Sequence, residues 1–145
     1  MDRFIGWLNH HRPYYMDLLR VYLGVGLLVK GCYFVANTQF LVDTLGTTGT
    51  PMAGPALAHL IGAIHIVGGA FMAIGFLTRF AIAAQIPILT GAVFLVHLRE
   101  GLFAASQGLE FTAFVLFTLL LLFAYGPGHL SADHVIFRRK TEPSR

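Results

Sequence analysis

Residues Ala56–Leu98 read ALAHLIGAIHIVGGAFMAIGFLTRFAIAAQIPILTGAVFLVHL, and Arg79 is the only Asp, Glu, Lys or Arg among them. A helix needs about 20 apolar residues to cross a bilayer. The stretch is long enough for two such helices, at 56–76 and 80–98, joined by the short turn Leu77–Arg79. A pair of membrane-spanning helices therefore forms the centre of the predicted fold.

Two further apolar stretches flank this pair, at 17–36 and 109–125. Of the 145 residues, 56% are hydrophobic and 12% are charged, whereas a soluble domain carries about 25% charged residues. This composition excludes an ordinary water-soluble domain. We expect an all-α, integral membrane four-helix bundle in which residues 1–145 form a single domain embedded in the lipid bilayer.

The Lys and Arg residues predict the orientation of the bundle. They gather before the first helix, in the turn between the second and third, and in the tail, where Arg138, Arg139, Lys140 and Arg145 lie. The positive-inside rule places both termini in the cytoplasm. The net charge of +3 is therefore interpreted as a membrane-topology signal, and no nucleic-acid binding is expected.

The connecting segments follow from the same pattern. The N-terminal lead carries Trp7 and Tyr14–Tyr15, residues typical of a membrane interface, and we expect it to form a short interfacial helix. Residues 37–55 are expected to form a loop. Pro87 lies inside the third helix and is expected to kink it.

Small residues predict which helices approach closely. Gly24, Gly26 and Gly31 lie on the first helix, and the second carries the paired glycines Gly68–Gly69. Helix association in lipid depends on such residues. The fourth helix has few of them, so we expect much of its surface to face lipid or another protein.

Polar side chains inside membrane helices are functional candidates, because burying them is costly. At 1.5 Å of rise per residue, the candidates fall in the outer half of the bilayer, and together they predict a polar pocket open to the periplasm. The candidate pocket residues are Lys30, His59, His65, Gln85, His97 and Glu110.

Each candidate also has a simpler interpretation. Lys30 either extends to the outer interface or pairs with Glu110. His59 and His97 are interpreted as interfacial residues, and Glu110 suits a helix N-terminus. Gln85 could satisfy the backbone freed by the Pro87 kink. His65 lies deep in its helix, where a pocket-facing role and a structural role are equally supported.

The chemistry open to such a pocket is limited. The single cysteine excludes an intrachain disulfide and a cysteine-based zinc site. No sharp metal motif is present, although His65 and His97 on separate helices could ligate haem iron or another metal. A Lys, a Glu and a His in an apolar pocket could instead bind a quinone head group and pass protons. A quinone is favoured over haem.

Three segments resemble the DoxX family of small four-helix bacterial membrane proteins. They are LRVYLGVGLLVKG (Leu19–Gly31), GAIHIVGGAFMAIGFLTR (Gly62–Arg79), and GLEFTAF followed by GPGHLSADH (Gly126–His134). The residues that match family positions are Lys30, Arg79, Glu110, Ser131 and Asp133. His65 departs from the family, which often has Glu there, and this favours a ligand or proton-carrier role over a carboxylate role.

The resemblance implies a multi-pass protein of the bacterial inner membrane that is linked to redox chemistry. Some family members are subunits of a thiosulfate:quinone oxidoreductase, and others are associated with thiol and oxidative-stress enzymes. This chain has no flavin motif and no iron–sulfur ligand set, so we expect other membrane subunits as partners.

Three functions follow as hypotheses. The first is a redox-associated subunit, with a quinone or an electron donor near the outer pocket. The second is a non-catalytic accessory subunit that stabilises a larger electron-transfer complex in the membrane. The third is a transporter of a small anion. No broken-helix pair or inverted repeat in the sequence supports this third hypothesis strongly.

Overall fold

The computed structural model describes residues 2–47, 49, 54–98 and 108–125, with side chains from Tyr14 onward. The helices are α1 (Asp2–Ala36), α2 (Thr38–Thr47), α3 (Pro55–Ile74), α4 (Thr78–Gly91), the π-helix η1 (Ala92–His97) and α6 (Gly108–Tyr125). No strand occurs in the described residues. The all-α prediction is confirmed.

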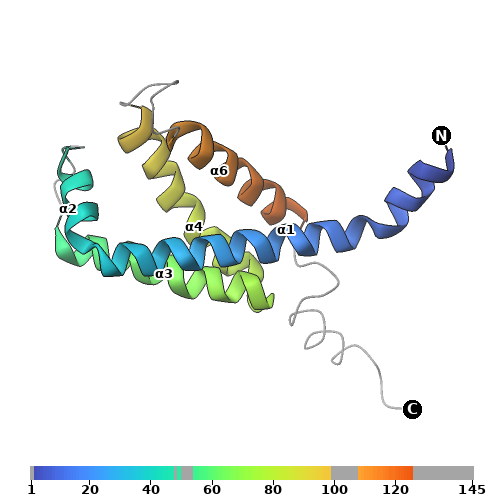
Figure 1. The fold of residues 1–145 in the computed structure, drawn as a ribbon, viewed down its shortest axis with the longest axis horizontal. Helices are drawn as coiled ribbons and strands as arrows, with labels where there is room; N and C mark the ends of the chain where they lie inside the picture. Colours follow the sequence, from blue (N-terminus) through green and yellow to red (C-terminus); the bar gives the residue numbers. More distant parts are fainter. Residues whose placement is uncertain (1, 48, 50–53, 99–107, 126–145) are drawn as a thin grey trace, which may run out of the picture.

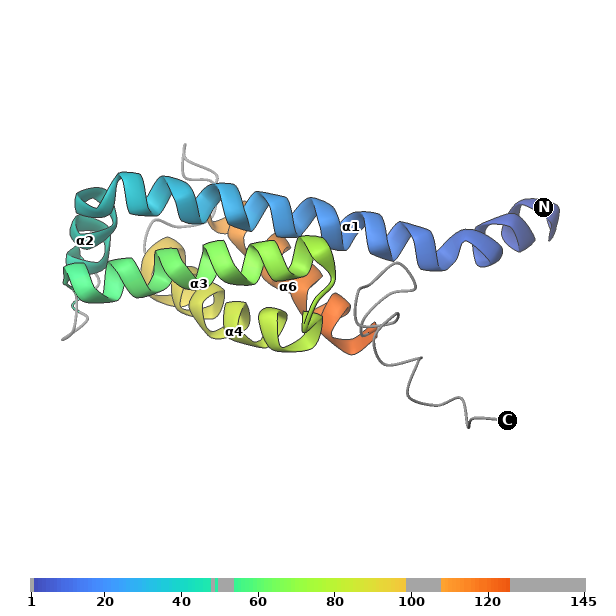
Figure 2. The same cartoon turned by 90° about the horizontal axis from the view of Figure 1, so that it is seen from below.

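Four helical segments are long and apolar enough to cross a membrane: Tyr14–Ala36, Pro55–Ile74, Thr78–His97 and Gly108–Tyr125. They agree with the four predicted spans in number and to within a few residues at each end. The start of the first span and the end of the fourth lie at the same end of the bundle (Figure 2). The cytoplasmic placement of that end stays a prediction.

Two layers of helices build the bundle. α1 and α3 run side by side in both views, and α4 and α6 cross over them as the second layer (Figure 1, Figure 2). α3 has the largest buried share of the four spans, 33% against 28% for each of the others. It packs against α1, α2 and α4 and is therefore the central element.

Glycines allow α1 and α3 to lie in direct backbone contact. A Cβ atom on Gly24 would come within 2.5 Å of the Ala73 nitrogen, and one on Gly69 within 2.5 Å of the Leu28 nitrogen. Gly68, the residue before Gly69, faces α4 instead, where a Cβ would lie 2.7 Å from Gln85 Nε2. The paired glycines therefore serve two different interfaces.

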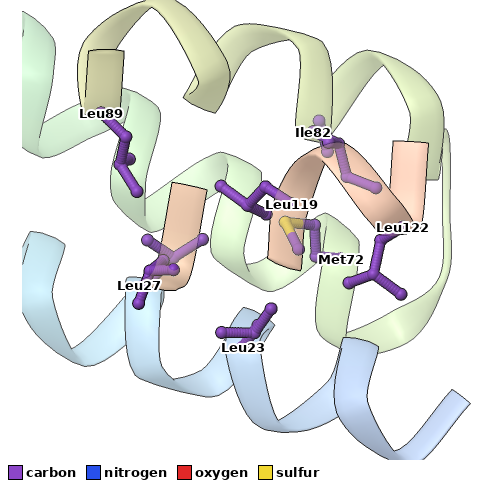
Figure 3. Close-up of a cluster of buried hydrophobic side chains, with 9 residues drawn as sticks. Leu23, Leu27, Met72, Ile82, Leu89, Leu119 and Leu122 are labelled. Carbon is purple, nitrogen blue, oxygen red and sulfur yellow. The ribbon is translucent and has the colours of Figure 1, made fainter. Parts of the chain in front are cut away.

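Apolar side chains from all four spans meet between the layers. Figure 3 shows Leu23 and Leu27 of α1, Met72 of α3, Ile82 and Leu89 of α4, and Leu119 and Leu122 of α6 pointing toward one another. Lipid is as apolar as these residues, so their packing contacts, rather than removal from water, hold the layers together.

The predicted N-terminal helix is present, but it is the first part of α1 rather than a separate element. α1 is a single helix of 35 residues, about 50 Å long, so it exceeds the hydrocarbon thickness of about 30 Å. Its first turns project beyond the bundle (Figure 1, Figure 2). Their position at the membrane interface stays a prediction.

The expectation of a loop over residues 37–55 is wrong for its first half, where α2 forms. Thr38 Oγ1 donates to the Val35 carbonyl, and Gln39 Nε2 donates to Asp43 Oδ1 one turn later. These local bonds, with Leu41 buried, stabilise ten helical residues. α2 stands crosswise at the end of the bundle where α1 meets α3 (Figure 1, Figure 2).

The turn between α3 and α4 forms where the sequence predicts it. Gly75 ends α3 with a positive φ of 78°, and the N–H groups of Gly75 and Phe76 both donate to the Phe71 carbonyl. A left-handed residue at this point is the usual helix ending that glycine permits. The chain then reverses through Leu77, and Arg79 lies exposed in the first turn of α4.

The last part of the third span differs from the predicted α-helix, because it is a π-helix. The span continues through Pro87 as α4 to Gly91, and η1 then follows. At the end of η1 the Leu98 N–H donates to the Val93 carbonyl, five residues earlier instead of four. Such π segments occur often at functional sites.

The α1–α3 contact predicts a difference between two glycines of one helix. Gly24→Ala forces a methyl group into the α3 backbone, so we expect a loss of about 1–3 kcal/mol of unfolding free energy. Gly26→Ala is the matched control, because nothing lies within 4 Å of its Cβ position. Thermal unfolding in detergent measures both, and equal stability of the two variants would contradict this packing.

Candidate functional site

Phe34 of α1 brings together two of the candidate residues. The Lys30 ammonium lies 5.2 Å from the centre of the Phe34 ring, and the His65 ring packs edge-on against the same ring at 5.5 Å between centroids. Lys30 also lies 6.0 Å from the Tyr33 ring. We call Lys30, Tyr33, Phe34 and His65 the α1–α3 cluster.

His65 reaches this cluster because α1 and α3 are so close. It is buried, and a Cβ on Gly31 would lie 2.8 Å from the His65 Cβ. Its Nδ1 lies 3.0 Å from the Ile61 carbonyl oxygen on the preceding turn. The imidazole is therefore fixed between its own helix and the Phe34 ring.

Lys30 lies at the outer surface of the cluster. Its side chain is exposed and reaches toward the rings three and four residues later, in the direction of the α2 end. This is the direction that an extended lysine takes to approach the interface. The ammonium lies close enough to both rings for a cation–π attraction.

Of the two interpretations of Lys30, the pairing with Glu110 does not occur in the structure. Lys30 contacts the aromatic rings of its own helix, and Glu110 lies exposed in the first turn of α6. α1 makes few contacts with α6 and packs along α3 instead. Opposite charges on two helices do not meet when the helices carrying them are not neighbours there.

Gln85 joins α4 to α3 beside the cluster. The side chain is completely buried, and its Nε2 donates to the Ile64 carbonyl at 3.0 Å. The expectation that it would satisfy the backbone around Pro87 is wrong, because the amide bonds to a different helix. Its Oε1 is buried without a hydrogen-bond partner in the described residues.

The other two histidines lie apart from the cluster. His59 is exposed, and its Nδ1 lies 2.7 Å from the Pro55 carbonyl oxygen of its own helix. His97 ends η1 and packs on the start of α6, where a Cβ on Gly108 would lie 2.7 Å from its Nδ1. The recorded contacts bring Lys30 and His65 together through Phe34, and a pocket shared by all six candidates stays a prediction.

A metal centre finds no support in this geometry. No three His, Cys, Asp or Glu side chains are grouped so that they could hold a metal ion, over the residues that the structure describes. His65 packs against Phe34 and His97 against Gly108. Ligation of haem iron by this pair stays a prediction from the sequence alone. Ser131 and Asp133 lie outside the described residues.

Two features of the structure, one in the cluster and one elsewhere on α1, escaped the sequence analysis. Phe34 looks like any lipid-facing aromatic residue, although its place one turn after Lys30 is a usable signal. Asp17 and Arg20 form a buried ion pair with 3.2 Å between Oδ1 and Nη1. Their spacing of three residues puts them on one helix face, and that spacing could have revealed the pair.

The family profile of DoxX matches residues 15–98, which include α2, α3 and the whole α1–α3 cluster. This chain belongs to the DoxX family. A relative in Bacillus subtilis (strain 168), named "Putative oxidoreductase CatD", is 28% identical over 123 residues, which cover 85% of this chain and 87% of the relative. No solved structure matches the DoxX chain described here.

The Asp17–Arg20 pair yields a stability prediction. Arg20→Met removes the cation beside a buried carboxylate, so we expect a loss of about 3–5 kcal/mol. The double variant Asp17→Asn, Arg20→Met removes both charges and should recover a large part of that loss. Chemical denaturation in detergent measures these variants together with the single variant Asp17→Asn. A double variant whose loss of stability equals the sum of the two single losses would show that the pair is not coupled.

Proposed function

We propose that this DoxX protein is a redox-associated membrane subunit that binds a quinone head group at the α1–α3 cluster. A single observation carries the proposal: an ammonium and an imidazole from different helices contact the same aromatic ring, Phe34. The family membership and the oxidoreductase name of the bacterial relative support the redox association.

The residues present suit a quinone head group. The head group is a flat ring with oxygen atoms at its edge, so it needs an aromatic surface and a hydrogen-bond donor. Tyr33 and Phe34 supply rings, and the Lys30 ammonium has three donor hydrogens and no acceptor. Lys30 and Tyr33 are exposed on a membrane-spanning helix, and a lipid-soluble ligand can approach such a surface from within the bilayer.

Lys30 alone would not support this proposal, because a lysine extending to the interface explains its direction equally well. His65 adds the second argument. Burying an ionisable side chain within a membrane span costs free energy, so its presence there favours a functional role. A histidine that only fills space does not account for its position against the ring that also faces the Lys30 ammonium.

Electron transfer requires a partner in this proposal. The chain has one cysteine and neither a flavin motif nor an iron–sulfur ligand set. Its residues would hold and orient the head group and accept or supply protons, while a second membrane protein would carry the electron-transfer group.

The accessory-subunit function remains the second candidate, and one feature favours it. α6 exposes Phe111, Phe114 and Phe117 at intervals of three residues, so one face of the helix presents large apolar rings outside the bundle. Such a face suits a neighbouring membrane subunit as well as it suits lipid.

Photoaffinity labelling tests the quinone site. The protein in lipid nanodiscs is irradiated with an azido-substituted benzoquinone, and the labelled peptides are identified by mass spectrometry. We expect labelling near Tyr33 and Phe34 that excess unlabelled benzoquinone displaces. Lys30→Met should reduce it about fivefold or more, because one hydrogen bond from a charged donor is lost.

Tyr22→Met is the control for this experiment, because Tyr22 is exposed on the same helix about two turns before Lys30 and should leave the labelling unchanged. Labelling that is spread evenly over the exposed faces of α1 and α6 would contradict the proposed site.

Native electrophoresis of mild-detergent extracts tests the need for a partner. We expect the protein to migrate in stoichiometric amounts with a membrane protein that carries a redox group. Migration as a monomer or a small homo-oligomer would exclude the accessory-subunit function and would leave the proposed site without an electron-transfer partner.

A further inference from the structure

The hydrogen bond of His65 with its own helix determines which ring nitrogen can serve a ligand. Nδ1 lies 3.0 Å from the Ile61 carbonyl oxygen, and a carbonyl oxygen only accepts hydrogen bonds. Nδ1 therefore carries the hydrogen in this bond. In the neutral ring Nε2 then has a lone pair and no hydrogen, so it can only accept.

That acceptor is not used elsewhere in the described part of the chain. Nδ1 makes the one hydrogen bond recorded for the His65 ring there. Nε2 is also not completely buried, so it keeps some accessible surface. A ligand that donates a hydrogen bond can meet this requirement.

The acceptor is held rigidly in place. Gly31 lies directly behind the His65 Cβ, and the Phe34 ring packs against the imidazole at 74°. Gln85 donates to the carbonyl of Ile64, the residue before His65, and thereby fixes the backbone from the side of α4. A binding group held by its supporting residues discriminates between ligands better than a mobile one.

The Lys30 ammonium supplies the complementary contact. It donates to an oxygen atom and does not distinguish a carbonyl oxygen from a hydroxyl oxygen, since both accept. His65 Nε2 does distinguish them, because a hydroxyl can donate to it and a carbonyl cannot. The two residues therefore divide the work: Lys30 contributes affinity and His65 contributes selectivity.

From this division we infer that the α1–α3 cluster prefers the reduced, hydroquinone form of its ligand, whose hydroxyl group donates to His65 Nε2 while Lys30 donates to an oxygen of the same head group. The inference rests on the proposed quinone site and specifies the redox state that it takes. A site with a buried polar group discriminates against a ligand that leaves that group unpaired.

Competition in nanodiscs under anaerobic conditions tests the preference. A decyl-substituted benzoquinone and the corresponding hydroquinone each displace the azido-benzoquinone label, and their partitioning is corrected with nanodiscs that hold lipid alone. For the unmodified protein we expect the hydroquinone to displace the label at an about fivefold lower concentration, as one additional hydrogen bond provides.

Three variants separate the roles. His65→Phe keeps an aromatic ring beside Phe34, and it should bring the ratio of the two concentrations to about one. Lys30→Met should weaken both forms similarly. His59→Phe is the matched control, because His59 makes the same type of Nδ1 contact on the same helix outside the cluster, and its ratio should remain that of the unmodified protein.

The outcomes distinguish this inference from the proposed function. Equal displacement by the two forms, or a ratio that persists in His65→Phe, overturns the preference and leaves the quinone site standing. No displacement by either form overturns both. If His65→Phe does not fold, His65→Gln replaces it, because an amide both donates and accepts and should also reduce the ratio to about one.

Discussion

The backbone contact between α1 and α3 is the constraint on which the rest of this membrane protein depends. Between helices in lipid no removal from water drives association, so close packing must supply the stability. Gly24 and Gly69 allow that packing, and the contact also sets the site. With the two helices pressed together, His65 turns inward onto Phe34, while Lys30, one turn before Phe34, stays at the surface.

Sequence reasoning reached the four spans and the α3–α4 turn, because span length, hydropathy and the Gly75 helix ending are local properties. It missed α2, since the apolar pattern is weak there and local bonds such as Gln39 to Asp43 stabilise the helix. The expectation that Gln85 satisfies the backbone freed by Pro87 was also wrong. A buried amide bonds to whichever carbonyl lies nearest, and here that carbonyl belongs to another helix.

The candidate site was predictable only in part. His65 was singled out for its depth, and the structure buries it. Its relation to Lys30 depends on how α1 and α3 are rotated against each other, which no single-helix pattern contains. Charge complementarity suggested Glu110 as the partner of Lys30, but α6 is not the helix beside Lys30. The aromatic contact with Phe34 could be recognised only once the rotation was known.

The π-helical segment at Ala92–His97 has a consequence for comparing members of the family. The Leu98 N–H bonds back five residues to Val93, so the segment holds one residue more than a regular helix would. A relative that lacks this residue would keep the length of its span, but every later side chain would be rotated by about 100°. His97 would then leave Gly108 and face a different neighbour. A one-residue gap in an alignment here marks a rotation of the following side chains around the helix axis. Histidines aligned with each other beyond the gap therefore need not occupy equivalent positions in the bundle.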